Sequence, residues 1–161
     1  MTTSEYNEIV EKYADRLFRY ILKNIRDREW ASDLVQDSYE KLWIRSRDVQ
    51  FSKAKSYLFS IAHNTMVDMI RKEKRQLVTD VSDFPEISDN RHYSDVKEIL
   101  DEGLKRLSEI QRSVILLRDY EGYNYEEIGE ITGLNESQVK VYIYRARVFL
   151  KNYIGQIERV I

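Results

Sequence analysis

Residues 125–151, YEEIGEITGLNESQVKVYIYRARVFLK, decide the fold because their pattern is that of two short helices joined by a tight turn. Gly133 follows Thr132 at a point where a left-handed residue is needed to end a helix. Asn135 is suited to cap the next helix, and Gln138 three positions later completes a capping-box-like pair for the free amides of its first turn. The stretch therefore predicts a helix-turn-helix motif.

The second of these helices has two contrasting faces. One face is apolar and recurs at intervals of four, three and four residues, which predicts that it is buried. Its members are Val139, Ile143, Ala146 and Leu150. The exposed face consists of Ser137, Lys140, Val141, Tyr144 and Val148, flanked by Arg145, Arg147 and Lys151. Such a helix can enter a DNA major groove, with residues near its start at base edges and its cations at phosphates. An ordinary amphipathic helix has the same spacing, but the cap, the turn and the preceding helix favour DNA binding.

Composition indicates a globular, helical chain. The 161 residues are 42% hydrophobic and allow one domain or two small ones. One proline, five glycines and long periodic segments predict a nearly all-helical fold. The lack of cysteine excludes disulfides and thiolate metal sites. No apolar run approaches membrane-spanning length, and the N-terminus lacks a basic segment followed by an apolar one, so we expect a cytoplasmic protein without membrane insertion.

Charge is unevenly distributed along the chain. The formal net charge is −2, which by itself argues against a phosphate-binding protein. Residues 79–102, however, contain eight acidic and two basic residues, a local net charge of −6, so that the rest of the chain carries +4. The acidity is therefore concentrated in the middle of the chain and leaves both ends compatible with nucleic acid.

Two helices are predicted in the first 45 residues. Thr2 and Glu5 form a capping box for a helix that ends near Ile25, and Asp27 can cap a second helix over residues 28–45. The core candidates of the first are Tyr6, Ile9, Val10, Tyr13, Leu17, Phe18 and Ile21, and those of the second are Trp30, Leu34, Val35, Tyr39, Leu42 and Trp43. The polar face of the second helix carries Asp33, Gln36, Asp37 and Glu40. Spacing alone makes this face a solvated surface.

A third helix is predicted over residues 53–77, with Ser52 as its cap. Its core candidates are Leu58, Ile61, Ala62, Thr65 and Met69, and another face carries Asn64, Asp68 and Arg71. The helix ends in the basic run Arg71, Lys72, Lys74 and Arg75, which the rings of Tyr57, Phe59 and His63 precede. Rings interleaved with cations suit single-stranded nucleic acid. Core packing of Phe59 and surface ion pairs explain the same residues, so both interpretations stay open.

The middle of the chain separates two helical parts. Residues 77–94 lose the helical period and contain the only proline, Pro85, among acidic and small polar residues. Periodicity resumes at Asp95, and Ser108 with Gln111 forms another capping box, for a helix that stops at Gly122. We predict two all-α domains, residues 1–77 and 96–161, joined by a flexible acidic linker over residues 78–95.

The sequence offers no catalytic constellation. It contains no glycine-rich phosphate loop and no zinc-binding spacing, and the two histidines, His63 and His92, lie far apart and are expected on the surface. Neighbouring acids such as Glu126 and Glu127 point in different directions on a helix and form no acid–base pair. We therefore expect no catalytic residues, no metal and no cofactor, and a protein that is not an enzyme.

The order of these parts, over about residues 6–153, resembles a bacterial sigma factor of the small extracytoplasmic-function (ECF) group. DREWASDLVQDSYEKLW resembles the family's region-two helix that docks on the polymerase clamp, and SYLFSIAHNTMVDMIRKEKR resembles its promoter-melting helix. LSEIQRSVILLRDYEGYNYEEIGEITGLNESQVKVYIYRARVFL resembles region four. All three segments in this order, joined by an acidic tether, are specific to that family.

The resemblance implies a role for each surface. Asp33, Gln36 and Asp37 would dock on the clamp helices of core RNA polymerase. The loop 49–55 with Ala54 would line a pocket for a flipped base of the minus-ten element, with Asn64 nearby. The separated strand would be guided by Tyr57, His63, Arg71, Lys72, Lys74 and Arg75. The minus-thirty-five element would face Ser137, Lys140, Val141, Tyr144 and Arg145, with Arg147 at the flank. The family also implies that the linker lies in the RNA channel and that an anti-sigma factor is a partner.

The chain departs from the family pattern at the recognition helix. Val141 and Tyr142 stand where many relatives have serine and arginine, which removes hydrogen-bonding groups and leaves apolar surface for a thymine methyl group or a partner protein. Tyr57 likewise stands where relatives often have tryptophan. The alternatives to a promoter-specificity subunit are a polymerase-independent helix-turn-helix regulator and a helical adaptor without a nucleic-acid role.

Overall fold

The computed structural model describes residues 1–77 and 96–160. The elements in chain order are α1 (Thr3–Ile25), α2 (Arg28–Ile44), the 3₁₀ turn η1 (Phe51–Lys53), α3 (Ala54–Leu77), α4 (Val96–Arg106), α5 (Glu109–Ile115), the π-helical turn η2 (Leu116–Tyr120), α6 (Tyr125–Thr132) and α7 (Glu136–Val160). All regular structure in the described residues is helical, which confirms the all-α prediction. The predicted linker over residues 78–95, with Pro85 and His92, lies outside the described residues.

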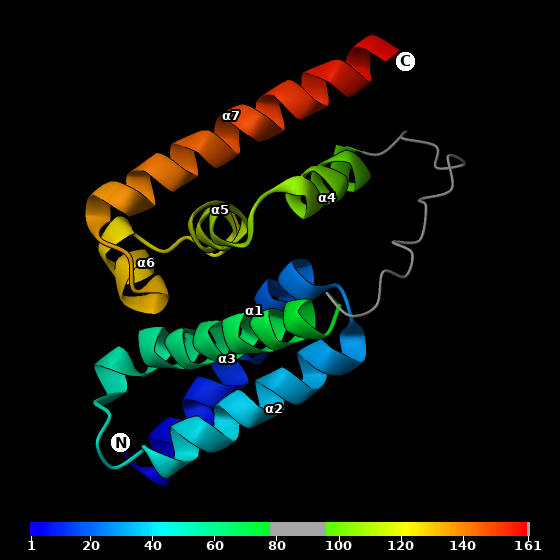
Figure 1. The fold of residues 1–161 in the computed structure, drawn as a ribbon. Helices are drawn as coiled ribbons and strands as arrows, with labels where there is room; N and C mark the ends of the chain where they lie inside the picture. The colour runs from blue at the N-terminus through cyan, green and yellow to red at the C-terminus, as the bar shows by residue number, and fades with distance from the viewer. Residues whose placement is uncertain (78–95, 161) are drawn as a thin grey trace.

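Helices α1, α2 and α3 form a front group (Figure 1). The Thr2–Glu5 capping box begins α1, and Arg26 ends it in the left-handed conformation at φ 56°. The Asp27 side chain accepts a hydrogen bond from the Trp30 amide and so caps α2, as predicted. Ser52 was expected to cap α3, but it lies inside η1, and the helix instead continues out of that tight turn.

The front core is built on the aliphatic and aromatic side chains of all three helices. Its fully buried members include Leu17, Tyr20, Ile21, Leu34, Leu42, Leu58 and Phe59. Trp43, expected in this core, is 48% exposed and packs edge to face on Tyr6 with ring centroids 4.9 Å apart. The prediction for Trp43 was therefore wrong, because its helical position lies at the border between the buried and exposed faces of α2.

Helices α4 to α7 form a rear group, in which α4 and α5 pack against α7. The Ser108 side chain accepts a hydrogen bond from the Gln111 amide at 3.3 Å and begins α5. The helix widens into η2 and ends before Gly122, whose φ of 77° is strained for any residue with a Cβ atom. α7 extends to Val160, beyond the predicted stretch that ended at residue 151.

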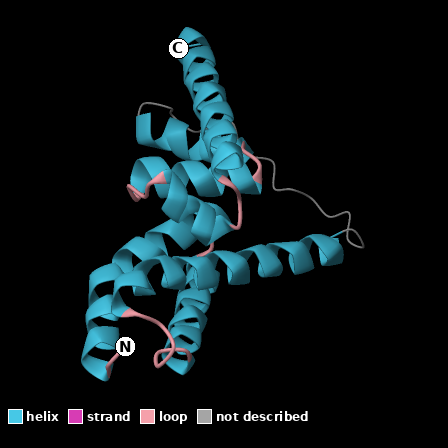
Figure 2. Cartoon of the chain, turned by 90° about the vertical axis from the view of Figure 1, so that its left-hand side faces the viewer, coloured by secondary structure: helices cyan, strands magenta, loops and turns pink. Residues whose placement is uncertain are grey.

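The two groups lie directly against each other. α6 packs on α3 and α5 contacts α1, so that one core cluster continues from the front group into the rear group (Figure 1). Tyr123 of the rear group packs against Phe59 of the front group, with ring centroids 5.1 Å apart. The start of α1 and the far end of α7 lie at opposite ends of the molecule (Figure 2). Among the described helices, none combines the length and apolar character needed to cross a bilayer.

Candidate nucleic-acid interface

The helix-turn-helix is held by local hydrogen bonds at three points. Asn124 and Glu127 form a reciprocal capping box at the start of α6. Gly133 takes the left-handed conformation at φ 80° and its amide donates to the Gly129 carbonyl at 2.8 Å, which ends the helix. The Gln138 amide donates to Asn135 Oδ1 at 2.8 Å, and the Asn135 amide donates to Gln138 Oε1 at 3.0 Å. The predicted turn and caps are confirmed.

The recognition helix α7 buries the face that its spacing predicts. Val139, Ile143, Ala146 and Leu150 are all buried. Every residue predicted to face the minus-thirty-five element is exposed, namely Ser137, Lys140, Val141, Tyr144, Arg145 and Arg147. In Figure 1 the helix lies on the side of the rear group that faces away from α1, α2 and α3. The front group therefore leaves this face open to a duplex.

Two cations of α7 are held by nearby groups. Lys140 Nζ lies 3.3 Å from Glu136 Oε1 and 5.6 Å from the centre of the Tyr125 ring. Arg147 Nε donates to Asp119 Oδ2 at 3.1 Å, and this hydrogen bond raises the pKa of the Arg147 guanidinium. Arg145 has no hydrogen-bond or ion-pair partner among the described residues, so its charge is the least compensated of the three.

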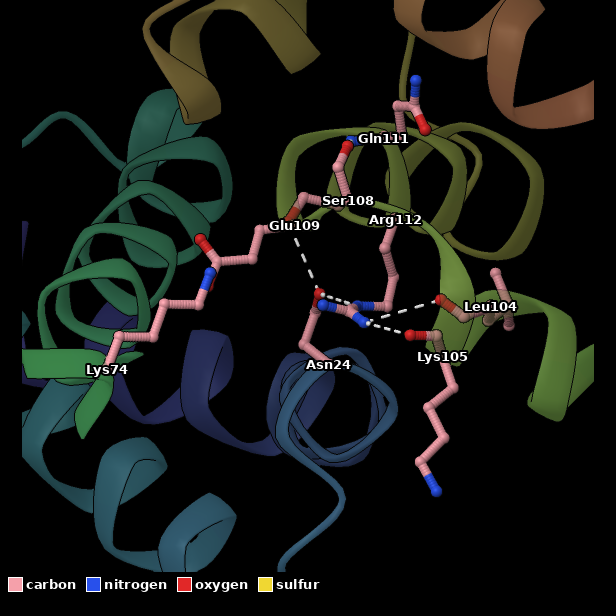
Figure 3. A network of polar contacts seen from close by, with 9 residues as sticks. Asn24, Lys74, Leu104, Lys105, Ser108, Glu109, Gln111 and Arg112 are labelled. Atoms are coloured by element: carbon pink, nitrogen blue, oxygen red, sulfur yellow. Dashed lines mark hydrogen bonds and ion pairs between the residues drawn. The ribbon is translucent and has the colours of Figure 1, made fainter. Parts of the chain in front are cut away.

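Helix α3 presents a polar and basic surface. Asn64, Arg71, Lys72, Lys74 and Arg75 are exposed along it, and Tyr57 is half-buried. Lys74 Nζ lies 3.5 Å from Glu109 Oε1 of the rear group (Figure 3). One cation of the predicted strand-handling run, Lys74, therefore lies at the edge of the contact between the two groups.

Two residues assigned to the minus-ten element, one to the separated strand and one to the flipped-base pocket, are inside the protein. His63 is 4% exposed, and its Nδ1 lies 3.0 Å from the Tyr20 hydroxyl. Burial lowers the pKa of the His63 imidazole to about 4, so the ring is neutral near pH 7. Ala54 is fully buried. The expectation that His63 lies on the surface was wrong, and neither side chain can reach DNA in this arrangement.

A sequence signal for the burial of His63 was present. Phe59, Ala62 and Met66 are buried at intervals of three and four, and His63 lies four residues after Phe59 on the same stripe. Because the imidazole ring is polar, His63 was not assigned to the buried face of the helix. Tyr20, which provides its hydrogen bond, was not among the predicted core residues either, although it is fully buried.

The surface assigned to polymerase docking combines charge with apolar contact area. Asp33 and Gln36 are exposed, and Asp37 Oδ2 lies 3.2 Å from Lys41 Nζ. Next to them is a hollow lined by Tyr6, Gln36, Tyr39, Glu40, Trp43 and Ile44. Ile44 is 76% exposed at its edge. Tyr39 lines the hollow, and burial raises the pKa of its hydroxyl to about 12.

Polar contacts between the two groups were not predicted from the sequence. Glu121 is 3% exposed, and its carboxylate accepts hydrogen bonds from Arg19 Nε at 3.0 Å and Arg19 Nη2 at 2.9 Å. Arg16 adds an ion pair at 3.4 Å and a hydrogen bond from Nη2 to the Glu121 carbonyl. Elsewhere in this interface, Arg112 Nε donates to Asn24 Oδ1 at 3.3 Å (Figure 3).

Comparisons with known proteins match both groups of helices. Residues 9–76 match the family described as Sigma-70 region 2, and residues 97–150 match Sigma-70, region 4. The chain is 33% identical over 132 residues to the RNA polymerase sigma factor SigV of Bacillus subtilis, covering 80% of this chain and 78% of that one. It is 27% identical over 150 residues to the ECF RNA polymerase sigma factor SigM of the same organism, covering 90% and 92%.

A solved structure has the same arrangement of helices. The co-crystal structure of the sigma factor RpoE with the anti-sigma factor NepR from Bartonella quintana has a TM-score of 0.81 and 25% identity. The match covers 95% of this chain and 98% of that chain. With the helix-turn-helix, this defines a transcription protein of the sigma-70 family, and the chain belongs to that family. Within it, the chain is an RNA polymerase sigma factor of the ECF group.

Proposed function

We propose that the chain divides the tasks of a sigma factor between its two groups of helices. Residues 1–77 bind core RNA polymerase and handle the opened minus-ten element, residues 96–161 read the minus-thirty-five duplex, and residues 78–95 link them. The observation that supports this division is the separation of two exposed surfaces: the outward face of α7 and the basic run of α3. The protein acts in the cytoplasm and directs initiation without catalysing a reaction itself.

The test of this division uses purified core polymerase and matched promoter DNA. Arg145→Ala should weaken duplex binding about equally across sequences and lower the slope of log K against log salt by about 1. Lys140→Ala should have a smaller effect on both the affinity and the salt slope, because Glu136 already compensates the charge of Lys140. Arg71→Ala with Lys72→Ala should impair strand opening more than duplex binding. An unchanged permanganate footprint in that double variant would contradict the division.

The docking surface is tested separately. Asp33, Gln36 and Asp37 are proposed to contact the polymerase, and their replacement by alanine should remove the chain from a pull-down with core enzyme. A polymerase-independent regulator would form no stable complex even before mutation. Absence of initiation by the intact chain, once inhibitors are removed, would reject the sigma-factor assignment of both groups.

An anti-sigma factor is the second partner that we propose. The solved relative is described as a complex with a protein of that class, and its likeness to this chain covers both helical groups. Copurification of the native protein from cells is the test. A free pool of the protein, active without removal of any inhibitor, would contradict this proposal while leaving the polymerase assignment intact.

A further inference from the structure

The exposed face of α7 carries an apolar stripe, which consists of Val141, Tyr144 and Val148. These side chains are 44%, 70% and 41% exposed, and their spacing of three and four places them on one side of the helix. Large exposed apolar side chains along one helix face indicate a surface with a partner. The stripe begins in the second turn of the helix, within the part of a recognition helix that reaches base edges.

Three polar side chains near the stripe, those of Gln138, Lys140 and Tyr142, already have contacts within the protein. The amide group of Gln138 is fixed at the N-cap by its bond with Asn135. Lys140 lies against Glu136 and the Tyr125 ring, and Tyr142 is half-buried against the core. Val141 is therefore an exposed apolar side chain on this face, with Ser137 one turn before it and Tyr144 and Arg145 one turn after it.

Charge identifies the partner as DNA and not as another apolar protein surface. Residues 136–151 contain one acidic residue, Glu136, and four basic residues, Lys140, Arg145, Arg147 and Lys151. A stripe bordered by cations fits a groove bordered by phosphates. Every base presents hydrogen-bonding atoms in the major groove, but thymine alone adds a C5 methyl group, so this methyl is the feature that an apolar valine side chain can distinguish.

We propose that Val141, with Tyr144 beside it, selects thymine in the minus-thirty-five duplex by contact with the C5 methyl group. This inference rests on the proposed function of residues 96–161 and adds the base that this position prefers. The contact buries about one methyl group, which corresponds to about a fourfold gain in affinity for thymine over a base that lacks the methyl.

The experiment replaces thymine by deoxyuridine, which pairs identically but lacks the methyl group. The full-length chain is first incubated with core polymerase and DNA, and the DNA that the complex retains is sequenced. The probe is a synthetic duplex with the sequence found in this way. Each thymine of the minus-thirty-five element is replaced in turn, and binding is measured by fluorescence anisotropy at one salt concentration. The affinity of the intact chain should fall about fourfold when deoxyuridine replaces thymine at one or two positions. The affinity of Val141→Ala should not fall when the same positions are replaced.

Val148→Ala, which removes the same atoms two turns further along the helix, is the matched control and should keep the response to deoxyuridine. Equal binding of all probes by a chain that binds the duplex normally would overturn the methyl contact but not the proposed function. A response that persists in Val141→Ala would assign the contact to another residue and overturn the proposal as well. Failure to bind any duplex, with or without polymerase, would instead reject the proposed function of residues 96–161.

Discussion

His63 is a residue whose position in the structure differs from the position predicted from the sequence. Its neighbours in the sequence resemble a strand-binding surface, but its ring lies in the core with Nδ1 3.0 Å from the Tyr20 hydroxyl. The contact gives each of these two buried polar groups a hydrogen-bond partner. The pKa of the imidazole falls from 6.5 to about 4 because burial disfavours the charged form.

The low pKa of His63 predicts a loss of stability in mild acid. The unfolded chain binds a proton at this residue as the pH falls below 6.5, whereas the folded chain does not until the pH approaches about 4. The contribution of His63 is therefore complete above pH 6.5 and is lost progressively as the pH falls from 6.5 to 4. We expect the free energy of unfolding to drop by about 2 kcal/mol from this group between pH 7 and pH 5. Urea unfolding at the two pH values measures the change.

His63→Gln provides the control, because glutamine can still accept a hydrogen bond from Tyr20 but does not titrate. This variant should be less stable than the natural chain at pH 7 and should lose less stability between pH 7 and pH 5. An identical pH dependence in both proteins would show that other groups are responsible for the acid sensitivity.

The helix-turn-helix is the element whose structure depends most closely on glycine. A Cβ atom at Gly129 would lie 2.8 Å from the Leu134 carbonyl oxygen, which belongs to the backbone of the turn and cannot move independently. We expect Gly129→Ala to destabilise the rear group by about 1–2 kcal/mol, since the clash outweighs the better helix propensity of alanine. Thermal unfolding and binding to the minus-thirty-five duplex measure the effect, and both should decline together.

Gly155→Ala in α7 is the matched substitution without a clash. A Cβ atom at Gly155 meets no atom within 4 Å, so alanine should be neutral or raise stability by up to about 1 kcal/mol. Equal effects of the two substitutions would contradict the role of close backbone approach at Gly129.

Helix starts and buried faces could be predicted where the determinants are local. The caps at Thr2, Asp27 and Asn135 and the left-handed Gly133 each depend on residues within one turn of the chain. The position of Trp43 and the burial of His63 were missed because both depend on which neighbouring helix lies opposite. Whether the candidate DNA-facing residues other than His63 and Ala54 bind DNA stays a prediction, although the structure places most of them at the surface.

At the scale of the whole molecule, the contact between the two groups could not be predicted from the sequence. The sequence left open whether Phe59 is buried, and it did not indicate that Tyr123 from the rear group covers it. Glu121 likewise follows an ordinary helix end in the sequence. Its carboxylate is buried only because Arg16 and Arg19 come from α1, more than a hundred positions earlier in the chain.

The contact has a geometric consequence for promoter binding. The names of the two elements place them about 25 base pairs apart, which is about 85 Å of duplex. A compact chain of 161 residues has a radius of gyration of about 15 Å, which is small beside this separation. We therefore expect the two groups to separate when the protein engages both elements as proposed.

Glu121 should control how readily this separation occurs. Glu121→Ala removes the carboxylate that binds Arg16 and Arg19 and so breaks the polar link between the two groups. The two guanidinium groups can return to water, because the arginine side chains are already 39% and 47% exposed. Loss of these charge-assisted hydrogen bonds should weaken the closed state by about 2 kcal/mol. Small-angle X-ray scattering should then show a radius of gyration above the value of about 15 Å expected for the compact chain.

The control for that substitution is Glu126→Ala, which removes an exposed carboxylate a few residues away in α6 and should leave the scattering unchanged. Binding of the minus-thirty-five duplex by the free chain should be similar in both variants, because the outward face of α7 is open in the closed arrangement as well. Binding of single-stranded minus-ten DNA should increase in Glu121→Ala alone, since α6 then leaves α3. A larger radius of gyration without increased strand binding would mean that α6 does not obstruct the strand-handling surface. An unchanged radius of gyration would mean that the apolar contact of Tyr123 with Phe59 holds the two groups together without the ion pair.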